Sequence, residues 1–439
     1  MKPIKVVILG AGESGVGAAL LAKKNNCEVF VSDFSEITKN FKKELIANKI
    51  DFEEGKHTEE KIFEGDLIIK SPGIPDKVPV IQESLKRGIN VISEIEFAAK
   101  YTKAKIIAIT GSNGKTTTTK LTYHLLKSAG VDVGLGGNIG FSFARLLAQK
   151  KQYAFYVLEL SSFQLDNIQE FRPDIAVLLN ITPDHMDRYD YKLSNYVKSK
   201  FRIMMNQRVG DLFIYNISDV NINEFMNGKR IKMETIPVRQ YAFFEKEKIE
   251  VEGETFKMAK CSLKGPHNYF NATCAITAAL KVGVAPKVIQ RALKKFVNDP
   301  HRLEVVANIN GIEFINDSKA TNVDAVYHAL LAMEKPVIWI VGGVDKGNDY
   351  QPIKKLVKDK VKAIVCLGVD NEKLLDFFKG STTKMLETQN VLEAVKMSIE
   401  FAEKDDVVLL SPACASFDLF KNYKDRGDQF REAVQLFVS

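Results

Sequence analysis

The sequence predicts an α/β protein built from several parallel sheets. Nine short runs rich in Val, Ile and Leu are each bounded by glycine or polar residues, and helical patterns separate them. Continuous apolar runs of this kind are typical of parallel strands buried on both faces. At 439 residues the chain exceeds the length of one common domain, so we expect three domains. The runs are KVVILG, EVFVSD, DLIIKSPG, KIIAITG, YVLELSS, DIAVLLN, PVIWIVGG, KAIVCLG and VVLLSP.

Two changes of composition indicate the domain boundaries. A charged helix near EIEFAAKYTKAK closes the first series of strands and helices, and a polar segment with proline, NDPHRLE, follows the helix VIQRALKKF. We therefore expect domains at 1–95, 96–298 and 299–439. The first and third are predicted to be doubly wound, Rossmann-like units.

Composition excludes several classes of protein. The 62 basic and 55 acidic residues give a net charge of +7 and are interspersed, which argues against a nucleic-acid surface. Five scattered cysteines without a C-x-x-C pair indicate reduced thiols and no zinc site. No run approaches the ~18 uncharged apolar residues that span a bilayer, and the first apolar run stops at glycines, unlike a signal peptide. We expect a cytoplasmic protein without membrane insertion.

The first strand is followed by a glycine pattern typical of a diphosphate site. VVILGAGESGVGAA fits G-x-G-x-x-G with Gly10, Gly12 and Gly15, and Asp33 ends the next strand. The glycines let the backbone approach a pyrophosphate at a helix N-terminus, and the acidic side chain binds a ribose hydroxyl. A purely structural turn is the alternative. The pattern does not distinguish NAD from a nucleotide sugar.

The strand KIIAI leads into a shortened phosphate-binding loop, ITGSNGKTTTTKL. Only two residues separate Gly111 from Gly114-Lys115-Thr116, where the usual P-loop has four. Lys115 can reach β- and γ-phosphates, and the Thr116 hydroxyl can bind Mg²⁺. A glycine turn with a solvated lysine is the alternative. The loop lies between a strand and a helix, so we predict a P-loop ATPase-like mononucleotide-binding fold for the central domain.

Two polar segments follow the next strands. Glu159 ends the strand YVLEL and is suited to bind Mg²⁺ in a Walker-B-like position. His185 lies between Asp184 and Asp187 in ITPDHMDRYD. Magnesium prefers oxygen, so His185 is either a metal ligand or a loop-stabilising residue, and the two aspartates also suit helix capping or a turn.

The helix around LSNYVKSKFRIMMN carries Lys198, Lys200 and Arg202. The simplest interpretation is a solvated basic face. A lysine beside a metal can instead take up CO₂ as a carbamate, which converts a cation into a bidentate anion able to bridge metals. The residues alone leave both interpretations open.

The remaining candidate residues lie in polar segments after residue 264. Asn268 and Asn271 share a face of the first turn of a predicted helix, where they suit an adenine edge or are N-caps. Arg302 and Asp317 lie in HRLE and NDSKATN, segments that bind anions or cap helices. Strand-end segments carry side chains suited to an amino-acid pocket: Lys346, Ser416, Phe417 and Tyr423.

Taken in order, these motifs resemble the Mur ligase family over the whole chain. They are ITGSNGKTTT, ELSSFQL, DHMDRY, the Tyr196, Lys200, Ile203 spacing, GPHNYFNA, HRLE and NDSKATN. The short P-loop is a mark of this family. SPGIP, GGNIG and SPACASFDLFKNYKDRGDQF are similar to the member that adds D-glutamate, and the D-N-P-R signature of the diaminopimelate- and lysine-adding members is absent.

The resemblance implies an ATP-dependent carbon–nitrogen ligase that forms ADP and phosphate. It would join D-glutamate to UDP-N-acetylmuramoyl-L-alanine through an acyl phosphate, in cytoplasmic peptidoglycan precursor synthesis. We expect a monomer whose partners are these small molecules and ATP, with no nucleic acid. Two Mg²⁺ ions and a carbamylated Lys200 are the implied cofactors.

The resemblance also implies a role for each motif residue. Lys115, Glu159, His185 and Lys200 would be catalytic, and Thr116, Glu159, His185 and carbamylated Lys200 would serve the metals. The ATP site would comprise Gly111, Asn113, Gly114, Lys115, Thr116, Thr117, Asn268, Asn271, Arg302 and Asp317. The UDP-substrate site would comprise Ser14, Gly15, Asp33, Ser71, Gly73 and Asn138, and the D-glutamate site Lys319, Thr321, Lys346, Ser416, Phe417 and Tyr423.

Three other functions are considered. Another Mur-type ligase or a folylpolyglutamate synthetase would share the ATP chemistry, although SPGIP and the first domain disfavour the folate enzyme. The N-terminal glycines suit an NAD-dependent oxidoreductase fused to an ATPase. A nucleotide-gated binding module would bind ATP without turnover.

Overall fold

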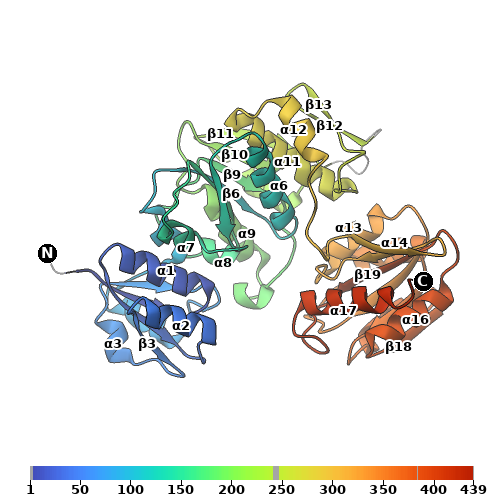
Figure 1. Ribbon diagram of the computed structural model, residues 1–439, viewed down its shortest axis with the longest axis horizontal. Coiled ribbons are helices and arrows are strands. Elements are labelled where there is room, and N and C mark those ends of the chain that lie inside the picture. The colour runs from blue at the N-terminus through green and yellow to red at the C-terminus, as the bar shows by residue number, and fades with distance from the viewer. Residues whose placement is uncertain (1–2, 241–246, 383, 439) are drawn as a thin grey trace. The chain divides into compact units, whose positions relative to one another are not determined.

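The computed structural model describes residues 3–240, 247–382 and 384–438, which form two compact units (Figure 1). One unit contains residues 3–240, 247–257 and 270–295. The other contains 258–269, 296–382 and 384–438. All nine predicted strands are present in three large, mostly parallel sheets, which confirms the α/β class. The described part of the chain has no helix with the length and hydropathy needed to cross a membrane.

The first sheet has five parallel strands in the order β3-β2-β1-β4-β5. Val6 and Ile8 face one side of it and Val7 and Leu9 face the other, and all four are fully buried. Burial on both faces explains the continuous apolar runs. The elements are β1 Lys5–Leu9, α1 Glu13–Lys24, β2 Glu28–Asp33, α2 Lys39–Ala47, β3 Asp51–Glu54, α3 Glu59–Phe63, β4 Leu67–Lys70, α4 Pro79–Lys86, β5 Asn90–Ser93 and α5 Glu94–Ala99.

The second sheet has six parallel strands in the order β11-β10-β9-β6-β8-β7. An antiparallel hairpin, β12-β13, lies between its last strand and α11 in the sequence. The elements are β6 Lys105–Thr110, α6 Lys115–Ser128, β7 Val133–Gly137, α7 Phe143–Ala148, β8 Phe155–Glu159, α8 Ser162–Leu165, β9 Ile175–Leu178, η1 Met186–Tyr189, α9 Leu193–Phe201, η2 Arg202–Met204, β10 Leu212–Asn216, α10 Val220–Met226, β11 Glu234–Val238, β12 Lys248–Val251, β13 Glu254–Lys257, α11 Pro266–Val282 and α12 Pro286–Leu293.

One apolar core joins the first two sheets. Ile8 of β1 and Leu158 of β8 belong to the same buried cluster. Helix α1 packs against α7 so closely that a Cβ atom on Gly17 would lie 2.1 Å from Ser142 Oγ. Three sheets agree with three predicted domains, but the first two share a core and form one unit. The boundaries near residues 95 and 298 stay predictions.

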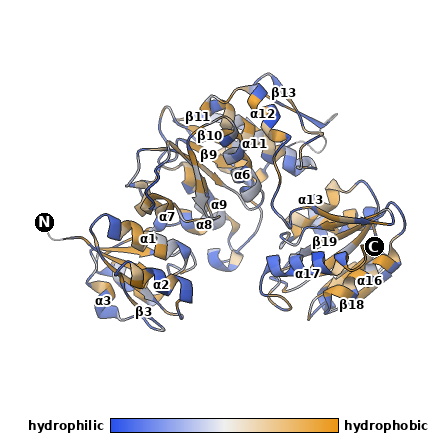
Figure 2. Cartoon of the chain, in the orientation of Figure 1, coloured by the Kyte–Doolittle hydropathy of each residue, from blue (hydrophilic) through white to orange (hydrophobic). Residues whose placement is uncertain are grey.

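The third sheet has six strands in the order β14-β15-β19-β16-β17-β18, and only β14 is antiparallel. Trp339 and Val341 pack on one face, Ile338 and Ile340 on the other. Figure 2 shows the strands as predominantly hydrophobic. The elements are β14 Glu304–Ile309, β15 Ile312–Asn316, α13 Val323–Ala332, β16 Val337–Gly342, α14 Gln351–Lys360, β17 Val361–Leu367, α15 Glu372–Phe378, β18 Lys384–Thr388, α16 Val391–Phe401, β19 Val407–Ala413 and α17 Tyr423–Gln435.

Candidate active site

The shortened P-loop joins β6 to α6 at the carboxyl edge of the second sheet. Gly114 caps α6 in the left-handed region at φ 82°, and a Cβ there would lie 2.4 Å from Asn271 Oδ1. Glycine is therefore required at this position on both conformational and steric grounds. Helix α6 begins at Lys115, so the loop delivers the N–H groups of a first helical turn, which bind anions.

Two lysines converge on one carbonyl oxygen of this loop. Lys115 Nζ lies 2.8 Å from the Gly111 oxygen, and Lys200 Nζ from α9 lies 2.8 Å from the same atom. Lys200 is only 1% exposed, and its Nζ lies 4.5 Å from the centre of the Tyr196 ring. Burial, and then the charge of Lys115, lower the pKa of Lys200 well below its ordinary value. The interpretation of Lys200 as part of a solvated basic face is wrong, although Lys198 is exposed.

Asn180, which the sequence analysis did not single out, holds the tip of the loop. Its Oδ1 accepts from Asn113 N at 2.8 Å, and its Nδ2 donates to Asn113 O at 3.1 Å. Ser112 Oγ donates to Thr182 O at 2.9 Å. Its position in the sequence was the signal that could have identified it. Asn180 is the last residue of the run DIAVLLN, just beyond β9, and polar residues at the carboxyl ends of parallel strands meet at one edge.

Glu159 ends β8, the neighbour of β6, and is 2% exposed. Its Oε1 accepts from Asn138 Nδ2 at 2.8 Å, whereas its Oε2 has no hydrogen-bond partner among the described residues. A buried carboxylate oxygen without a partner is costly, and a cation would stabilise it. Asn138, predicted to line the substrate site, also orients Glu159.

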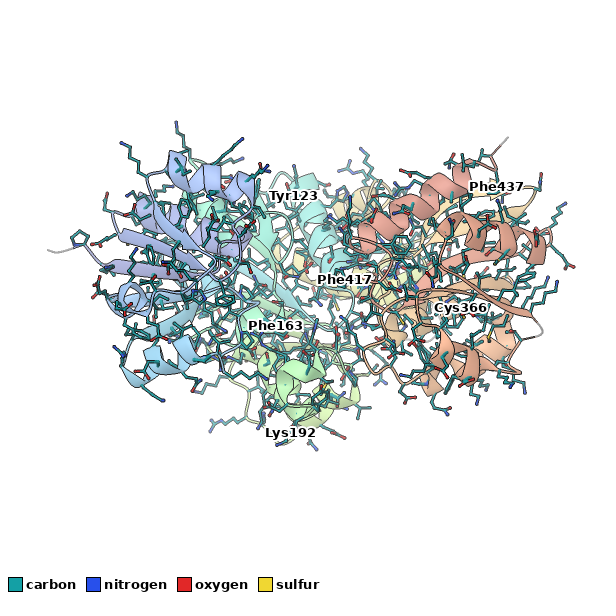
Figure 3. All side chains as sticks on the ribbon, turned by 90° about the horizontal axis from the view of Figure 1, so that it is seen from below. Tyr123, Phe163, Lys192, Cys366, Phe417 and Phe437 are labelled. Carbon is teal, nitrogen blue, oxygen red and sulfur yellow. The ribbon has the colours of Figure 1, made fainter. Side chains whose placement is uncertain are left out.

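His185 lies in a loop with unusual backbone geometry. His185, Asp190 and Tyr191 all have left-handed backbone angles, which are rare and strained outside glycine. The His185 ring lies 5.0 Å from the ring of Phe163, labelled in Figure 3, and its Nε2 lies 3.6 Å from Asp184 Oδ2. The side chain is 45% exposed, so His185 is accessible to a ligand as well as packed within its loop.

The donor atoms at this edge fit Mg²⁺ bound through phosphate. Among the residues that the structure describes, no group of three or more His, Cys, Asp or Glu side chains could hold a metal by itself. Magnesium is usually bound by one or two carboxylates together with waters and substrate phosphates, not by a cage of protein ligands. Thr116 in the first turn of α6 and the unpartnered Oε2 of Glu159 provide donors of that kind.

The glycines of the first sheet fall into two groups. A Cβ on Gly15 would lie 1.8 Å from Gly10 O, and one on Gly10 would lie 2.6 Å from Ser71 Oγ. A Cβ on Gly12 or Gly73 would meet no atom within 4 Å. Gly10 and Gly15 are therefore required for packing, whereas Gly12 and Gly73 border open space beside the β1–β4 switch point, where ligands bind in such sheets.

Asp33 fixes the glycine turn. Its Oδ2 accepts from Ala11 N at 2.6 Å, and its Oδ1 accepts from Ser35 N at 2.8 Å. Each carboxylate oxygen has further acceptor capacity. Ser14 is the second residue of α1, so its backbone belongs to the positive end of that helix. The structure thus assigns Asp33 a positioning role that the pattern did not predict.

Asn268 and Asn271 lie within α11 rather than at its N-cap, so the capping interpretation is wrong for both. Asn271 belongs to the first unit and lies against Gly114 of the P-loop. Asn268 groups with the second unit, and its Nδ2 donates to Lys264 O at 2.9 Å.

In the second unit, six of the other predicted residues follow the carboxyl ends of three adjacent strands, whereas Arg302 lies before β14 and Tyr423 begins α17. Strands β15, β19 and β16 are consecutive neighbours in the sheet. Asp317 is buried, accepts from Ser411 Oγ at 3.0 Å, and burial raises its pKa to about 7. The residues that follow these strands are Asp317, Lys319 and Thr321 after β15, Ser416 and Phe417 after β19, and Lys346 after β16.

A buried arginine organises these loops. Lys319 Nζ lies 3.9 Å from the ring centre of Tyr423, and Phe417, labelled in Figure 3, is 70% exposed. Arg426 is 1% exposed and donates to the carbonyl oxygens of Ser318, Gly342 and Cys414, one from each of the three strand ends. Arg426 belongs to the segment SPACASFDLFKNYKDRGDQF, but its role was not predicted, since its contacts come from segments up to 108 residues away.

Comparisons with known proteins match this architecture along the chain. Family models match the MurD N-terminal domain over residues 5–80, the Mur ligase middle domain over 109–279 and the Mur ligase glutamate ligase domain over 301–414. The first match does not support the oxidoreductase interpretation of the N-terminal glycines.

Relatives named UDP-N-acetylmuramoylalanine–D-glutamate ligase match nearly the full length. The protein from Christiangramia forsetii is 49% identical and the match covers 98% of this chain and 99% of that protein. The protein from Cytophaga hutchinsonii is 50% identical and the match covers 98% of each.

Solved structures share the fold at low identity. A pseudomurein peptide ligase type C from Methanothermus fervidus has a TM-score of 0.62 at 20% identity, with 99% of each chain covered. The UDP-N-acetylmuramate–alanine ligase from Thermotoga maritima has a TM-score of 0.61 at 19% identity, again with 99% of each chain covered. On the family models and the full-length relatives, the chain belongs to the Mur ligase family.

Proposed function

We propose that this protein is the ATP-dependent ligase that joins D-glutamate to UDP-N-acetylmuramoyl-L-alanine. The observation that carries the proposal is the convergence of two lysine nitrogens, Lys115 Nζ and Lys200 Nζ, on the Gly111 carbonyl at the strand edge that also holds Glu159. Relatives of that name, about half identical over the full length, support it. We assign the reaction to cytoplasmic precursor synthesis for the cell wall.

The chemistry explains why cations are needed. A carboxylate is a poor acylating agent, so the terminal carboxylate of the UDP substrate first attacks the γ-phosphorus of ATP and releases ADP. The D-glutamate amine then attacks the acyl phosphate and loses a proton, and the tetrahedral intermediate expels phosphate as the amide forms. Both steps develop negative charge on phosphoryl and carbonyl oxygens, which fixed positive groups stabilise.

The P-loop residues bind the triphosphate. Lys115 and the first-turn N–H groups of α6 neutralise the phosphates, with Gly111, Asn113, Gly114 and Thr117 completing the loop. Two Mg²⁺ ions, held through Thr116, Glu159 and His185 together with phosphate oxygens, would supply further charge neutralisation. Asn268, Asn271, Arg302 and Asp317 are assigned to ATP as well.

Lys200 is suited to carbamylation. A buried amine with a lowered pKa is neutral in a larger fraction of molecules, and only the neutral amine attacks CO₂. The nitrogen forms a bond to carbon and releases a proton, which leaves a carbamate anion in place of a cation. That anion would lie beside Lys115 and would provide oxygen ligands for a metal, which no group of three or more described His, Cys, Asp or Glu side chains could hold by itself.

The UDP substrate and D-glutamate are assigned to the carboxyl edges of the first and third sheets. The uridine diphosphate group is assigned to the first sheet, where Gly73 borders open space. The D-glutamate carboxylates are assigned to the lysines and hydroxyls of the third. The uridine diphosphate residues are Ser14, Gly15, Asp33, Ser71, Gly73 and Asn138, and the D-glutamate residues are Lys319, Thr321, Lys346, Ser416, Phe417 and Tyr423.

The test is a panel of amino acids. The protein is incubated with ATP, Mg²⁺ and UDP-N-acetylmuramoyl-L-alanine, and D-Glu, L-Glu, L-Lys, meso-diaminopimelate or L-Ala is added separately. Phosphate release and product mass are measured. The proposal predicts a new product with D-Glu alone. A product with another amino acid, or none with any, would contradict it.

A further inference from the structure

Arg188 connects the loop that carries His185 with a loop of the first sheet. Arg188 lies in η1, and its guanidinium donates to the carbonyl oxygens of Pro72 at 3.0 Å, Gly73 at 2.9 Å and Ile74 at 2.8 Å. The guanidinium carbon lies 4.8 Å from the centre of the Phe163 ring, the same ring that packs against His185. One side chain therefore contacts both loops, and both loops belong to the same compact unit.

The segment SPGIPD, residues 71–76, is also held from within the first sheet. Lys70 Nζ, on a side chain 1% exposed, donates to Ile74 O at 2.9 Å and lies 2.6 Å from Asp76 Oδ1. Asn167 Nδ2 donates to Asp76 Oδ1 at 3.3 Å. Two cations thus engage consecutive carbonyl groups of a segment that has no regular secondary structure.

This arrangement sets which face of the segment a ligand meets. A trans peptide unit places its C=O and N–H on opposite sides. Because Arg188 binds the Pro72 oxygen, the N–H of Gly73 points away from Arg188. A Cβ on Gly73 would meet no atom within 4 Å, so the backbone at this position can be approached closely by an anionic ligand.

We propose that Arg188 is a positioning residue. It fixes the segment 71–76, which we assign to the UDP substrate, relative to the loop that carries His185. It acts through the carbonyl groups of residues 72–74 and so determines where the substrate diphosphate lies relative to the γ-phosphate. The inference rests on the proposed function, because it assumes that the first sheet binds the UDP group. The left-handed residues His185 and Asp190 on either side of η1 give the Arg188 segment a defined conformation.

Two control variants test whether the effect of Arg188→Ala comes only from weakened packing between the first two sheets. Gln169 and Asn90 also join the first two sheets, with Gln169 Nε2 donating to Asn90 Oδ1 at 2.7 Å, but Asn90 begins β5 and lies at the amino edge, opposite the candidate site. Arg172 forms a two-pronged ion pair with Asp211 within the central sheet region. Gln169→Ala controls for a loosened junction, and Arg172→Ala controls for a lost arginine.

The experiment measures KM for each substrate, kcat and the melting temperature of the full chain. Arg188→Ala is expected to raise KM for UDP-N-acetylmuramoyl-L-alanine by about 10- to 100-fold, the loss typical of hydrogen bonds to a charged donor. KM for ATP should change by less than about 2-fold, since the P-loop makes none of these contacts. Arg188→Lys should retain part of the affinity, and millimolar guanidinium should partly rescue Arg188→Ala. Neither control should raise KM for the UDP substrate.

Binding of UDP and of a non-hydrolysable ATP analogue, measured by calorimetry, separates this inference from the proposed function. If the wild-type protein shows no ligase activity but Arg188→Ala selectively weakens UDP binding, the positioning role stands and the proposed reaction fails. Equal changes for both nucleotides, the same change in Gln169→Ala, unchanged UDP binding in Arg188→Ala, or no UDP binding by the wild-type protein would overturn the inference.

Discussion

Two glycine turns in this protein share a backbone design but differ in what surrounds them. Each follows a central strand of a parallel sheet and leads into a helix, from β1 to α1 and from β6 to α6. The first turn is fixed by a carboxylate, Asp33, on Ala11 N. The second is fixed by an amide, Asn180, and two lysine nitrogens contact its Gly111 carbonyl.

The two turns therefore suit different tasks. The first, which we call the binding turn, suits holding a phosphate group, and the second, which we call the transfer turn, suits moving one. Helix N-termini and glycine backbones suffice to hold a phosphate group. Transfer of a phosphoryl group also requires charge neutralisation where negative charge develops. We therefore expect substitutions around the second turn to reduce kcat and substitutions around the first to raise KM for the UDP substrate.

The largest effect is expected for Lys200→Ala, which removes the buried α9 amine that contacts the transfer turn. Ligase activity should fall by about 10³-fold, the upper range for loss of one electrostatic group. Lys198→Ala, on the exposed side of the same helix, is the control and should retain activity. If a carbamate forms on Lys200, a short-chain carboxylic acid should partly restore the activity of the alanine variant. Full activity without rescue would rule out the role of Lys200.

Glu159→Gln keeps the shape of the side chain and removes its charge. Because Glu159 Oε2 has no hydrogen-bond partner among the described residues, we expect it to serve a cation. Activity should fall by about 10²-fold, and saturation should require more Mg²⁺. The measurement is initial rate against Mg²⁺ concentration. An unchanged Mg²⁺ dependence would argue for a purely structural contact with Asn138.

Glycines at the carboxyl edge of the first sheet separate binding from packing, with Gly12 in the first turn and Gly73 after β4. Gly12→Ala and Gly73→Ala introduce a methyl group into open space and should leave the melting temperature nearly unchanged. Each should raise KM for the UDP substrate by about 10-fold, within the range for one misplaced methyl group. Gly15→Ala should instead destabilise the fold by about 3 kcal/mol, because its Cβ would overlap Gly10 O. If Gly12→Ala binds UDP normally, the open space is not the ligand site.

The smallest effect on activity is expected at Glu94, in the region between the two turns, where a substitution changes the pH dependence of stability. Glu94 begins α5, its Oε1 accepts from Ala144 N of α7, and burial raises its pKa from 4.5 to about 8. The folded chain therefore keeps a proton that the unfolded chain releases, so stability falls as pH rises through this window by up to about 1.4 kcal/mol per pH unit. Glu94→Gln should flatten the dependence of melting temperature on pH between about 5 and 8, whereas the exposed Glu59→Gln should not. A slope unchanged by Glu94→Gln would refute the assignment.

The sequence predicted the buried parts of the sheets better than their edges. All nine predicted strands exist because residues such as Val6 to Leu9 must be apolar on both faces. Strand β7 was missed because its sequence, VGLGG, is rich in glycine, and β11 because it is a half-exposed edge strand with Pro237. Pairing in the sheet sets these strands, and neither has a long apolar run.

The candidate site was predicted by motif, but the environment of its residues was not. Lys200 was predicted as a candidate, yet its burial depends on α9 lying against the P-loop, which no local pattern specifies. Asn180, Arg188 and Arg426 were missed because each has hydrogen-bond partners between 67 and 116 residues away in the chain. The pattern also gave Gly12 and Gly15 equal weight, whereas only tertiary packing distinguishes open space from close contact.

The central claim is that the second turn transfers the γ-phosphoryl group to the substrate carboxylate and not to water. UDP-N-acetylmuramoyl-L-alanine labelled with ¹⁸O in both oxygens of its terminal carboxylate is incubated with ATP, Mg²⁺, D-Glu and the protein, and the released phosphate is examined by mass spectrometry. Transfer through an acyl phosphate predicts one ¹⁸O atom in each phosphate formed with product. Unlabelled phosphate in this reaction would contradict the account. So would ¹⁸O in the phosphate when unlabelled substrate reacts in ¹⁸O-water.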